Sequence, residues 1–244
     1  MRHLALTVQY DGTDYRGFQS QPQGNTIQDE LERALTELLQ HPVKVTGAGR
    51  TDAGVHAIGQ VIALRTGNPI PEENLLRALN ALLGPAISAV ECRQVPDQFH
   101  PCYSASGKLY SYRILNRSLP SPFIERFAWH VSEPLDVEAM RQVAVRLKGE
   151  HDFAAFASAG SSARTTVRQI WRLDVETESE LIETRVAGSG FLYMMVRNIM
   201  GALVEAGRGR ISADDIEKIL HDLDRAAAPP PAPPQGLCLV RVEY

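Results

Sequence analysis

The sequence predicts an α+β protein of two ferredoxin-like lobes, in which helices cover antiparallel sheets. Three observations lead to this prediction. The chain has 244 residues, which suits two domains of ordinary size. Its first half alternates strand-like and helix-like patterns in the order β-α-β-β-α-β, which is the ferredoxin-like arrangement. Its second half follows a similar order without residue-level repetition, so we expect lobes at residues 1–104 and 105–244.

In the first lobe, residues 4–9 read as a strand that ends at the Asp11-Gly12 turn. Apolar residues then recur at helical spacing from Ile27 to Leu39, with Asn25 as the expected N-cap and Gln28 three residues later. Short apolar runs between turn residues predict strands over 43–46, 60–66 and 87–94. Helical spacing of apolar residues predicts a helix over 75–83, which Pro71 starts and Gly84-Pro85 stops.

The second lobe continues with the same kinds of pattern. Ser212 with Asp215 predicts the capped start of a short helix. Residues 226–234 hold five prolines and read as an extended surface connector, with a ligand for a partner domain as the alternative. The other elements are strands over 106–116, 126–131, 165–176, 180–187 and 237–242, and helices over 137–147 and 193–206.

Composition and charge indicate a folded, soluble protein, with 44% hydrophobic and 22% charged residues. The net charge of −4 means that a polyanion has to be held by a local basic patch. The three cysteines contain no C-x-x-C pair, which argues against a zinc site or disulfide framework and favours the cytoplasm. The N-terminus lacks a signal-peptide pattern, and charged residues interrupt the apolar stretch 191–206, so we expect a core helix there and no membrane partner.

Residues 47–57 read GAGRTDAGVHA and are the most informative stretch. A dinucleotide fingerprint requires a third glycine where Asp52 stands, and the chain has no P-loop, so phosphate cradling is disfavoured. The glycines free the backbone for positive φ and for close approach of a substrate. Arg50 and Asp52 share one side if the backbone is extended. A glycine-rich turn with a surface arginine and a capping aspartate fits this spacing equally well.

GAGRTDAGVHA resembles the signature of the tRNA pseudouridine synthase A family. Supporting matches run across nearly the whole chain: Tyr10-Asp11-Gly12-Thr13, Gly17-Phe18-Gln19, Thr26-Ile27-Gln28, Gly59-Gln60-Val61, Tyr110-Ser111-Tyr112, His151-Asp152-Phe153, Val196-Arg197-Asn198-Ile199 and Gly236-Leu237.

The resemblance implies an enzyme that binds tRNA as a homodimer and isomerises uridine to pseudouridine at positions 38 to 40 of the anticodon arm. It implies a cleft between the lobes with Asp52 as the essential carboxylate, and it implies no cofactor and no metal. Asp52 can attack C1′, attack C6 or remove the 2′ proton, and all three remain open.

Three further residues receive roles from the resemblance. Arg197 stands in an otherwise apolar helix, where it either snorkels to solvent or pairs with a buried acid, and the resemblance favours pairing with Asp52. Tyr110 and Tyr112 share one face of a strand, as core residues also do. The resemblance makes Tyr110 the active-site tyrosine, which can stack on the flipped uracil, and we also expect Tyr112 to contact the substrate. Arg50 is implied to fill the vacated stack.

Arginines supply 21 of the 25 basic residues and are the expected phosphate contacts. Arg164, Arg168 and Arg172 are spaced by four, and Arg208-Gly209-Arg210 is a compact basic loop; both sets are equally typical of solvated faces. Residues 100–103 read HPCY where relatives often have His-Ala-Arg-Phe, so one phosphate contact is lost or moved.

The alternative function is a non-catalytic RNA-binding protein on paired ferredoxin-like sheets, whose strands present aromatic side chains to bases. It accounts for the tyrosines and the arginines. It leaves Asp52 without a purpose, because an acid facing phosphates disfavours binding.

Overall fold

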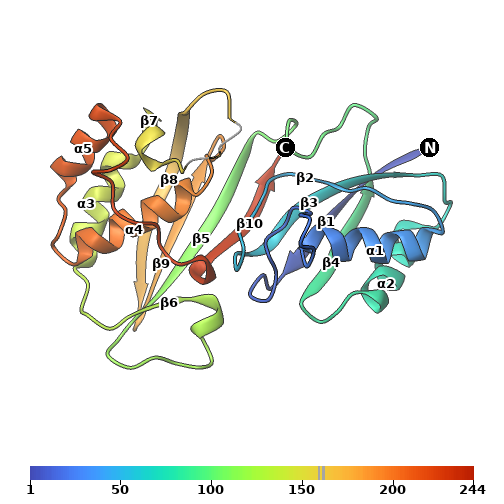
Figure 1. Cartoon of the computed structure of the whole chain (residues 1–244), viewed down its shortest axis with the longest axis horizontal. Coiled ribbons are helices and arrows are strands. Elements are labelled where there is room, and N and C mark those ends of the chain that lie inside the picture. The colour runs from blue at the N-terminus through green and yellow to red at the C-terminus, as the bar shows by residue number, and fades with distance from the viewer. Residues whose placement is uncertain (159, 161–162) are drawn as a thin grey trace. The chain divides into compact units, whose positions relative to one another are not determined.

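The computed structural model describes residues 1–158, 160 and 163–244 (Figure 1). The chain is an α+β protein of two compact units, one of Met1–Ser106 with Cys238–Tyr244 and one of Gly107–Leu237. The expected division put residues 238–244 in the second lobe. They pack with the first unit instead, because Cys238 and Leu239 pair in parallel with His56 and Ala57.

The first unit has the predicted β-α-β-β-α-β order. Strand β1 lies between β3 and β4 and is antiparallel to both. Its elements are β1 (Arg2–Tyr10), α1 (Ile27–Leu39), β2 (Thr46–Gly47), β3 (His56–Thr66), α2 (Glu72–Leu82), β4 (Ile87–Gln94) and the C-terminal β10 (Leu237–Glu243).

The core of this unit lies between its sheet and its two helices, which pack side by side (Figure 1). Leu4 and Leu6 of β1 are fully buried, as are Leu31 and Leu35 of α1 and Leu79 of α2. These are the positions that the helical and strand periodicities mark as apolar. Burial of each such side chain contributes about 1.5–3 kcal/mol of hydrophobic free energy.

Helix α1 begins one residue later than the sequence predicts. Thr26, not Asn25, is the N-cap, and its hydroxyl and backbone form a reciprocal capping box with Asp29. Asn25 has a left-handed φ of 59°, and its side-chain amide donates to the Asp14 carbonyl at 2.8 Å. Asn and Thr both favour the N-cap position. Thr26 is the cap because it has the extended backbone that this position requires.

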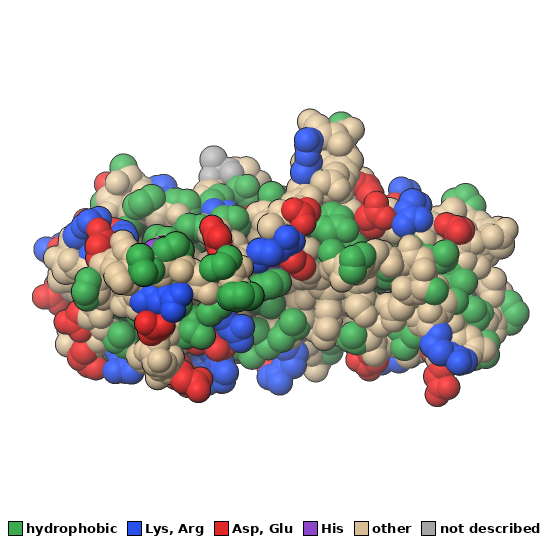
Figure 2. All heavy atoms as spheres, turned by 90° about the horizontal axis from the view of Figure 1, so that it is seen from below, with side chains coloured by type: hydrophobic (Ala, Val, Ile, Leu, Met, Phe, Trp, Pro, Cys, Tyr) green, Lys and Arg blue, Asp and Glu red, His purple; other side chains and the backbone are tan. Residues whose placement is uncertain are grey.

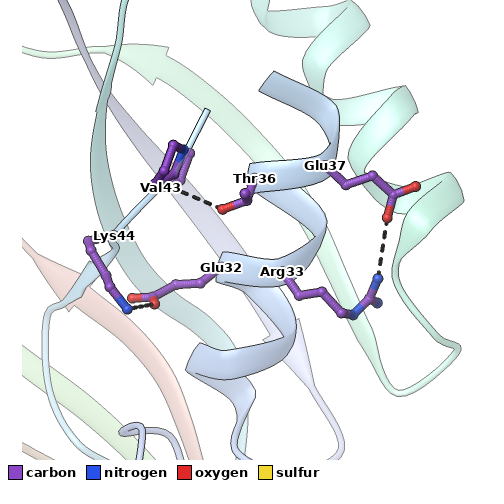
Figure 3. Close-up of a pocket in the computed structure, with 7 residues that line it drawn as sticks. Glu32, Arg33, Thr36, Glu37, Val43 and Lys44 are labelled. Carbon is purple, nitrogen blue, oxygen red and sulfur yellow. Dashed lines mark hydrogen bonds and ion pairs between the residues drawn. The ribbon is translucent and has the colours of Figure 1, made fainter. Parts of the chain in front are cut away.

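The predicted strand over 43–46 is wrong in most of its length, since β2 contains only Thr46 and Gly47. The reason is that side chains of α1 accept from backbone donors of this segment, and Figure 3 shows the bond from Val43 to Thr36. The Val43 N–H donates to Thr36 Oγ1 at 3.0 Å, and the Val45 N–H donates to Glu32 Oε1 at 3.1 Å. These donors are therefore satisfied without a strand partner.

The second unit has an antiparallel sheet in the order β5-β9-β8-β7, with β6 added in parallel to β5. Its helices pack together beside β8 (Figure 1). The main differences from the prediction are a 3₁₀ turn at residues 125–127, which shortens the strand expected over 126–131, and an additional polar strand, β7. The elements are β5 (Gly107–Asn116), β6 (Trp129–Val131), α3 (Val137–Leu147), β7 (Gly149–Asp152), β8 (Val167–Glu178), β9 (Leu181–Gly188), α4 (Met195–Gly207) and α5 (Ala213–Asp222).

Helix α4 is the predicted core helix, and Met195, Ile199 and Leu203 on it are fully buried. Within the described residues, no helix has both the length and the apolar character that crossing a membrane requires. The predicted cap of α5 is confirmed, because Ser212 and Asp215 form a capping box.

The proline-rich segment is not simply the surface connector that the sequence predicts. Ala232 is fully buried, and its N–H donates to the carbonyl of Arg197 on α4 at 2.9 Å. The segment therefore packs on a helix of its own unit.

Candidate active site

The loop between β2 and β3 carries the Arg50-Thr51-Asp52 triplet with alternating exposure. Thr51 is buried, with 6% of its surface exposed, whereas Arg50 is exposed and Asp52 is half-buried. The Thr51 hydroxyl is hydrogen bonded to the hydroxyl of Tyr10 at 2.8 Å. Exposure therefore alternates along the triplet, with Thr51 inside and Arg50 and Asp52 more exposed.

Hydrogen bonds to the backbone hold this loop at Ala48, Gly49 and Thr51. The Phe18 N–H donates to the Thr51 carbonyl at 3.0 Å, and the Ala48 N–H donates to the Val61 carbonyl at 2.8 Å. The buried side chain of Gln60 donates to the Gly49 carbonyl at 2.9 Å. A carboxylate on such a backbone needs little reorganisation to meet a substrate, which is what a chemical group requires.

Two glycines of the motif have identifiable roles in the fold. Of Gly47, Gly49 and Gly54, only Gly54 has a positive φ, at 78°. A Cβ on Gly47 would meet the Phe18 ring at 2.5 Å, so this glycine admits an aromatic side chain. A Cβ on Gly12 would lie 2.0 Å from the Val55 carbonyl, so the turn after β1 also approaches the loop closely.

Gly17→Ala is expected to destabilise the protein more than Gly24→Ala. Both glycines have positive φ, but a Cβ on Gly17 would lie 2.7 Å from the Thr51 carbonyl, whereas nothing lies within 4 Å of one on Gly24. We expect a loss of about 1 kcal/mol for Gly24→Ala and at least about 2 kcal/mol for Gly17→Ala in urea unfolding. Equal losses of unfolding free energy in the two variants would mean that the loop around Thr51 accommodates the added methyl group without strain.

Tyr10, Phe18 and Gln60 hold the loop, and the sequence does not assign these roles. All three stand in motifs that the resemblance quotes, which is the only signal that singles them out. Burial raises the pKa of the Tyr10 phenol, so this hydroxyl stays protonated beside Thr51.

Tyr110 and Tyr112 of β5 point to one face of the sheet and are both buried. The Tyr110 ring meets Phe191 edge-on, with ring centroids 5.3 Å apart. Tyr112 is fully enclosed, and its hydroxyl donates to the Pro233 carbonyl at 2.8 Å. This enclosure agrees with the core interpretation of Tyr112.

Arg197 lies on the first turn of α4, half-buried among apolar neighbours. Its Nε donates to the Ala232 carbonyl at 2.8 Å. The guanidinium is therefore held by the backbone of its own unit and does not simply extend into solvent.

Comparison with known proteins identifies the family of the chain. The sequence profile described as tRNA pseudouridine synthase matches residues 6–104 and 143–244. The chain belongs to this family. The relative named tRNA pseudouridine synthase A of Thermoanaerobacter sp. (strain X514) is 42% identical over 244 residues, with full coverage of both chains. Those of Acetivibrio thermocellus and Geotalea uraniireducens, with the same name, are each 44% identical over 244 residues and are covered completely.

In this family member, the arginines spaced by four do not form a single basic face. Arg164 is exposed before β8 begins. Arg168 donates to the carbonyl of Thr165 at 3.0 Å, and burial lowers the pKa of its guanidinium. Arg172 pairs with Asp174 at 2.6 Å. A bulge in β8 between Ile170 and Arg172 also breaks the alternation of side chains.

Two glutamates form ion pairs with Arg208 and Arg210 of the basic loop. Arg208 pairs with Glu133 and Glu205, each at 2.7 Å, and Arg210 pairs with Glu205 at 3.2 Å. On the face drawn in Figure 2, basic side chains likewise lie beside acidic ones. The charge of this loop is therefore largely compensated, which weakens its attraction for phosphates.

A groove beside α1 also has its charges already paired (Figure 3). Lys44 pairs with Glu32 at 2.6 Å, and Arg33 pairs with Glu37 at 3.6 Å. Among the described residues, no group of three or more His, Cys, Asp and Glu side chains is arranged to hold a metal ion.

Proposed function

We propose that this protein isomerises uridine to pseudouridine in the anticodon arm of tRNAs, with Asp52 as the essential carboxylate. The observation that carries the proposal is the family match, which extends over both units and includes the loop that presents Asp52. The rigid backbone around Thr51 supports it, since it positions a carboxylate at the surface where an RNA chain can reach it.

In the proposed reaction, the bond between N1 of uracil and C1′ of ribose breaks, the detached base turns over, and C5 bonds to C1′. C5 then loses its proton while N1 gains one, so atoms and electrons balance without a cofactor. Asp52 acts as nucleophile at C1′ or C6, or as the base that removes the 2′ proton. Each of these roles requires the ionised carboxylate.

Three other side chains complete the proposed machinery. Arg197 is the proposed ion-pair partner of Asp52. Tyr110 stacks on the flipped uracil, and Arg50 fills the space that the base leaves, because a stacked base has to be extruded before it can react. Arg164, Arg168, Arg208 and Arg210 are proposed phosphate contacts, the last two weakened by their glutamate partners. The enzyme is proposed to act as a cytoplasmic homodimer.

Purified protein is expected to release tritium to water from tRNA labelled at uracil C5, because C5 loses its hydrogen when pseudouridine forms. A chelator is expected to leave the rate unchanged. Release is measured in the solvent, and pseudouridine is mapped in the product. Binding of tRNA without tritium release or modified uridine would favour the alternative, a non-catalytic RNA-binding protein.

Arg50→Ala is expected to impair turnover on folded tRNA at saturation while the salt dependence of tRNA affinity stays nearly unchanged. The reason is its proposed role as the side chain that refills the stack. A substrate whose target uridine is already unpaired is expected to recover part of the rate, since extrusion costs less. Arg77→Ala, at an exposed arginine on α2 of the same unit, is the control. A flatter salt slope with a normal rate on folded tRNA would make Arg50 a phosphate contact.

A further inference from the structure

Residues 225–234, which we name the proline strap, are bonded to the first turns of α4. Ala232 contacts Arg197 twice: its N–H donates to the Arg197 carbonyl at 2.9 Å, and its carbonyl accepts from Arg197 Nε at 2.8 Å. The same short segment therefore holds both the backbone and the guanidinium of Arg197.

The sequence of the strap suits this contact. Between Pro229 and Pro234 every residue except Ala232 is a proline, so Ala232 carries the one backbone N–H of this stretch. That N–H is the donor to Arg197. The prolines restrict φ before the strap meets the helix, which reduces the entropy that is lost when the contact forms.

Two further contacts bring the strap close to α4. A Cβ on Gly201 would lie 2.0 Å from the Pro230 carbonyl, so the strap needs a glycine at this point of the helix. At the start of the strap, Arg225 donates to the side-chain oxygen of Asn198 at 2.9 Å. Asn198, fully buried, donates in turn to the Phe156 carbonyl at 2.7 Å.

A last contact joins the strap to β5. The Tyr112 hydroxyl donates to the carbonyl of Pro233, the residue directly after Ala232. A Cβ on Gly236 would lie 2.6 Å from the Tyr112 ring, so this glycine allows the chain to pass the ring closely. Burial raises the pKa of the Tyr112 phenol, and the positive charge of Arg197 lowers it in part, which fits their proximity.

We infer that the proline strap is a positioning element that fixes the guanidinium of Arg197 for the isomerisation, and that Tyr112 is a positioning residue that acts through the strap. This inference rests on the proposed function of Arg197. It gives Tyr112 a role without contact to the substrate. A fixed guanidinium matters because a displacement of about 1 Å in a catalytic group can lower a rate about 100-fold.

The first experiment compares Gly201→Ala with Gly207→Ala on the same helix. The atoms nearest to a Cβ on Gly207 belong to the side chains of Met140 and Leu135, at 3.1 and 3.2 Å, and none of them is part of the strap. With tritium-labelled tRNA in single turnover, we expect Gly201→Ala to lower the saturated rate at least about 10-fold, with the dissociation constant within about twofold. Gly207→Ala is expected to keep the rate. Equal rates for the two folded variants would overturn the inference.

Tyr112→Phe is the second variant, because it removes only the hydroxyl that binds Pro233 and keeps the ring. It is expected to lower the saturated rate about 3- to 10-fold without changing tRNA affinity. A double-mutant cycle then tests whether the strap acts through Arg197. In the Arg197→Met background, Gly201→Ala and Tyr112→Phe are each expected to add little further loss. A full additional loss in that background would show that the strap acts elsewhere.

A readout apart from activity separates this inference from the proposed function. The Arg197 Nε–H is expected to exchange slowly with water in the NMR spectrum of the wild-type protein, and Arg197→Lys identifies its signal. Gly201→Ala is expected to speed this exchange at least about 10-fold. An inactive wild-type protein with a protected Nε–H would refute the proposed function alone. An active one whose Nε–H exchanges as fast as in Gly201→Ala would refute the strap.

Discussion

Asp52→Asn is expected to abolish turnover while the affinity for tRNA stays the same or rises slightly. The substitution keeps the shape of the side chain and removes its charge, so it removes the group that each proposed reaction path needs. We expect the single-turnover rate to fall at least about 1,000-fold, since loss of a chemical group lowers the rate and leaves binding intact. Removing a negative charge that faces the phosphates accounts for the expected gain in affinity.

The fold is expected to tolerate this change. The loop is held by Thr51, by backbone bonds from Phe18 and Ala48 and by Gln60, none of which requires the charge on Asp52. Asp97→Asn serves as the control, because Asp97 is exposed in the same unit and pairs with Arg65 at 2.9 Å. It is expected to keep both rate and affinity. Turnover by Asp52→Asn near the wild-type rate would disprove the assignment of Asp52.

Arg197→Met is expected to be damaging in two ways. The rate is expected to fall at least about 100-fold, because the proposed catalytic machinery loses the positive charge of Arg197. The free energy of unfolding is expected to fall by about 1–3 kcal/mol, because the Ala232 carbonyl loses its charged donor. Single-turnover tritium release and urea unfolding measure the two effects separately.

The matched control is Arg146→Met on α3 of the same unit. Arg146 is half-exposed and pairs with Glu217 at 2.9 Å, so its replacement is expected to cost no more than about 1 kcal/mol and to leave the rate unchanged. A stable and fully active Arg197→Met would mean that Arg197 is an ordinary surface side chain. A stable but inactive one would separate its chemical role from its structural role.

Most elements of the fold could be predicted from local patterns. The helices over 27–39 and 137–147 and the strand over 87–94 have the predicted bounds. Their apolar residues repeat with the period of the element itself, and this signal needs no knowledge of distant residues. The alternation at Arg50, Thr51 and Asp52 follows from the same local geometry.

The error at residues 43–45 arose because their backbone groups bond to side chains outside the segment. The segment 43–45 reads as a strand, but Thr36 and Glu32 of α1 take its donors. The sequence also does not show that Arg208 of the basic loop pairs with Glu133, which lies 75 residues earlier. Charge and strand propensity are visible in the sequence, whereas such partners are not.

The sequence by itself determined the α+β class, most of the helices and strands, the family and the segment that carries Asp52, since all of these depend on local periodicity or on a contiguous motif. Only the tertiary structure decided what holds the candidate residues. Tyr112 finds its acceptor 121 residues later, at Pro233, and Arg197 finds its acceptor 35 residues later, at Ala232. Such contacts form only when the chain folds. They cannot be predicted from the sequence pattern, because no local period relates residues that far apart.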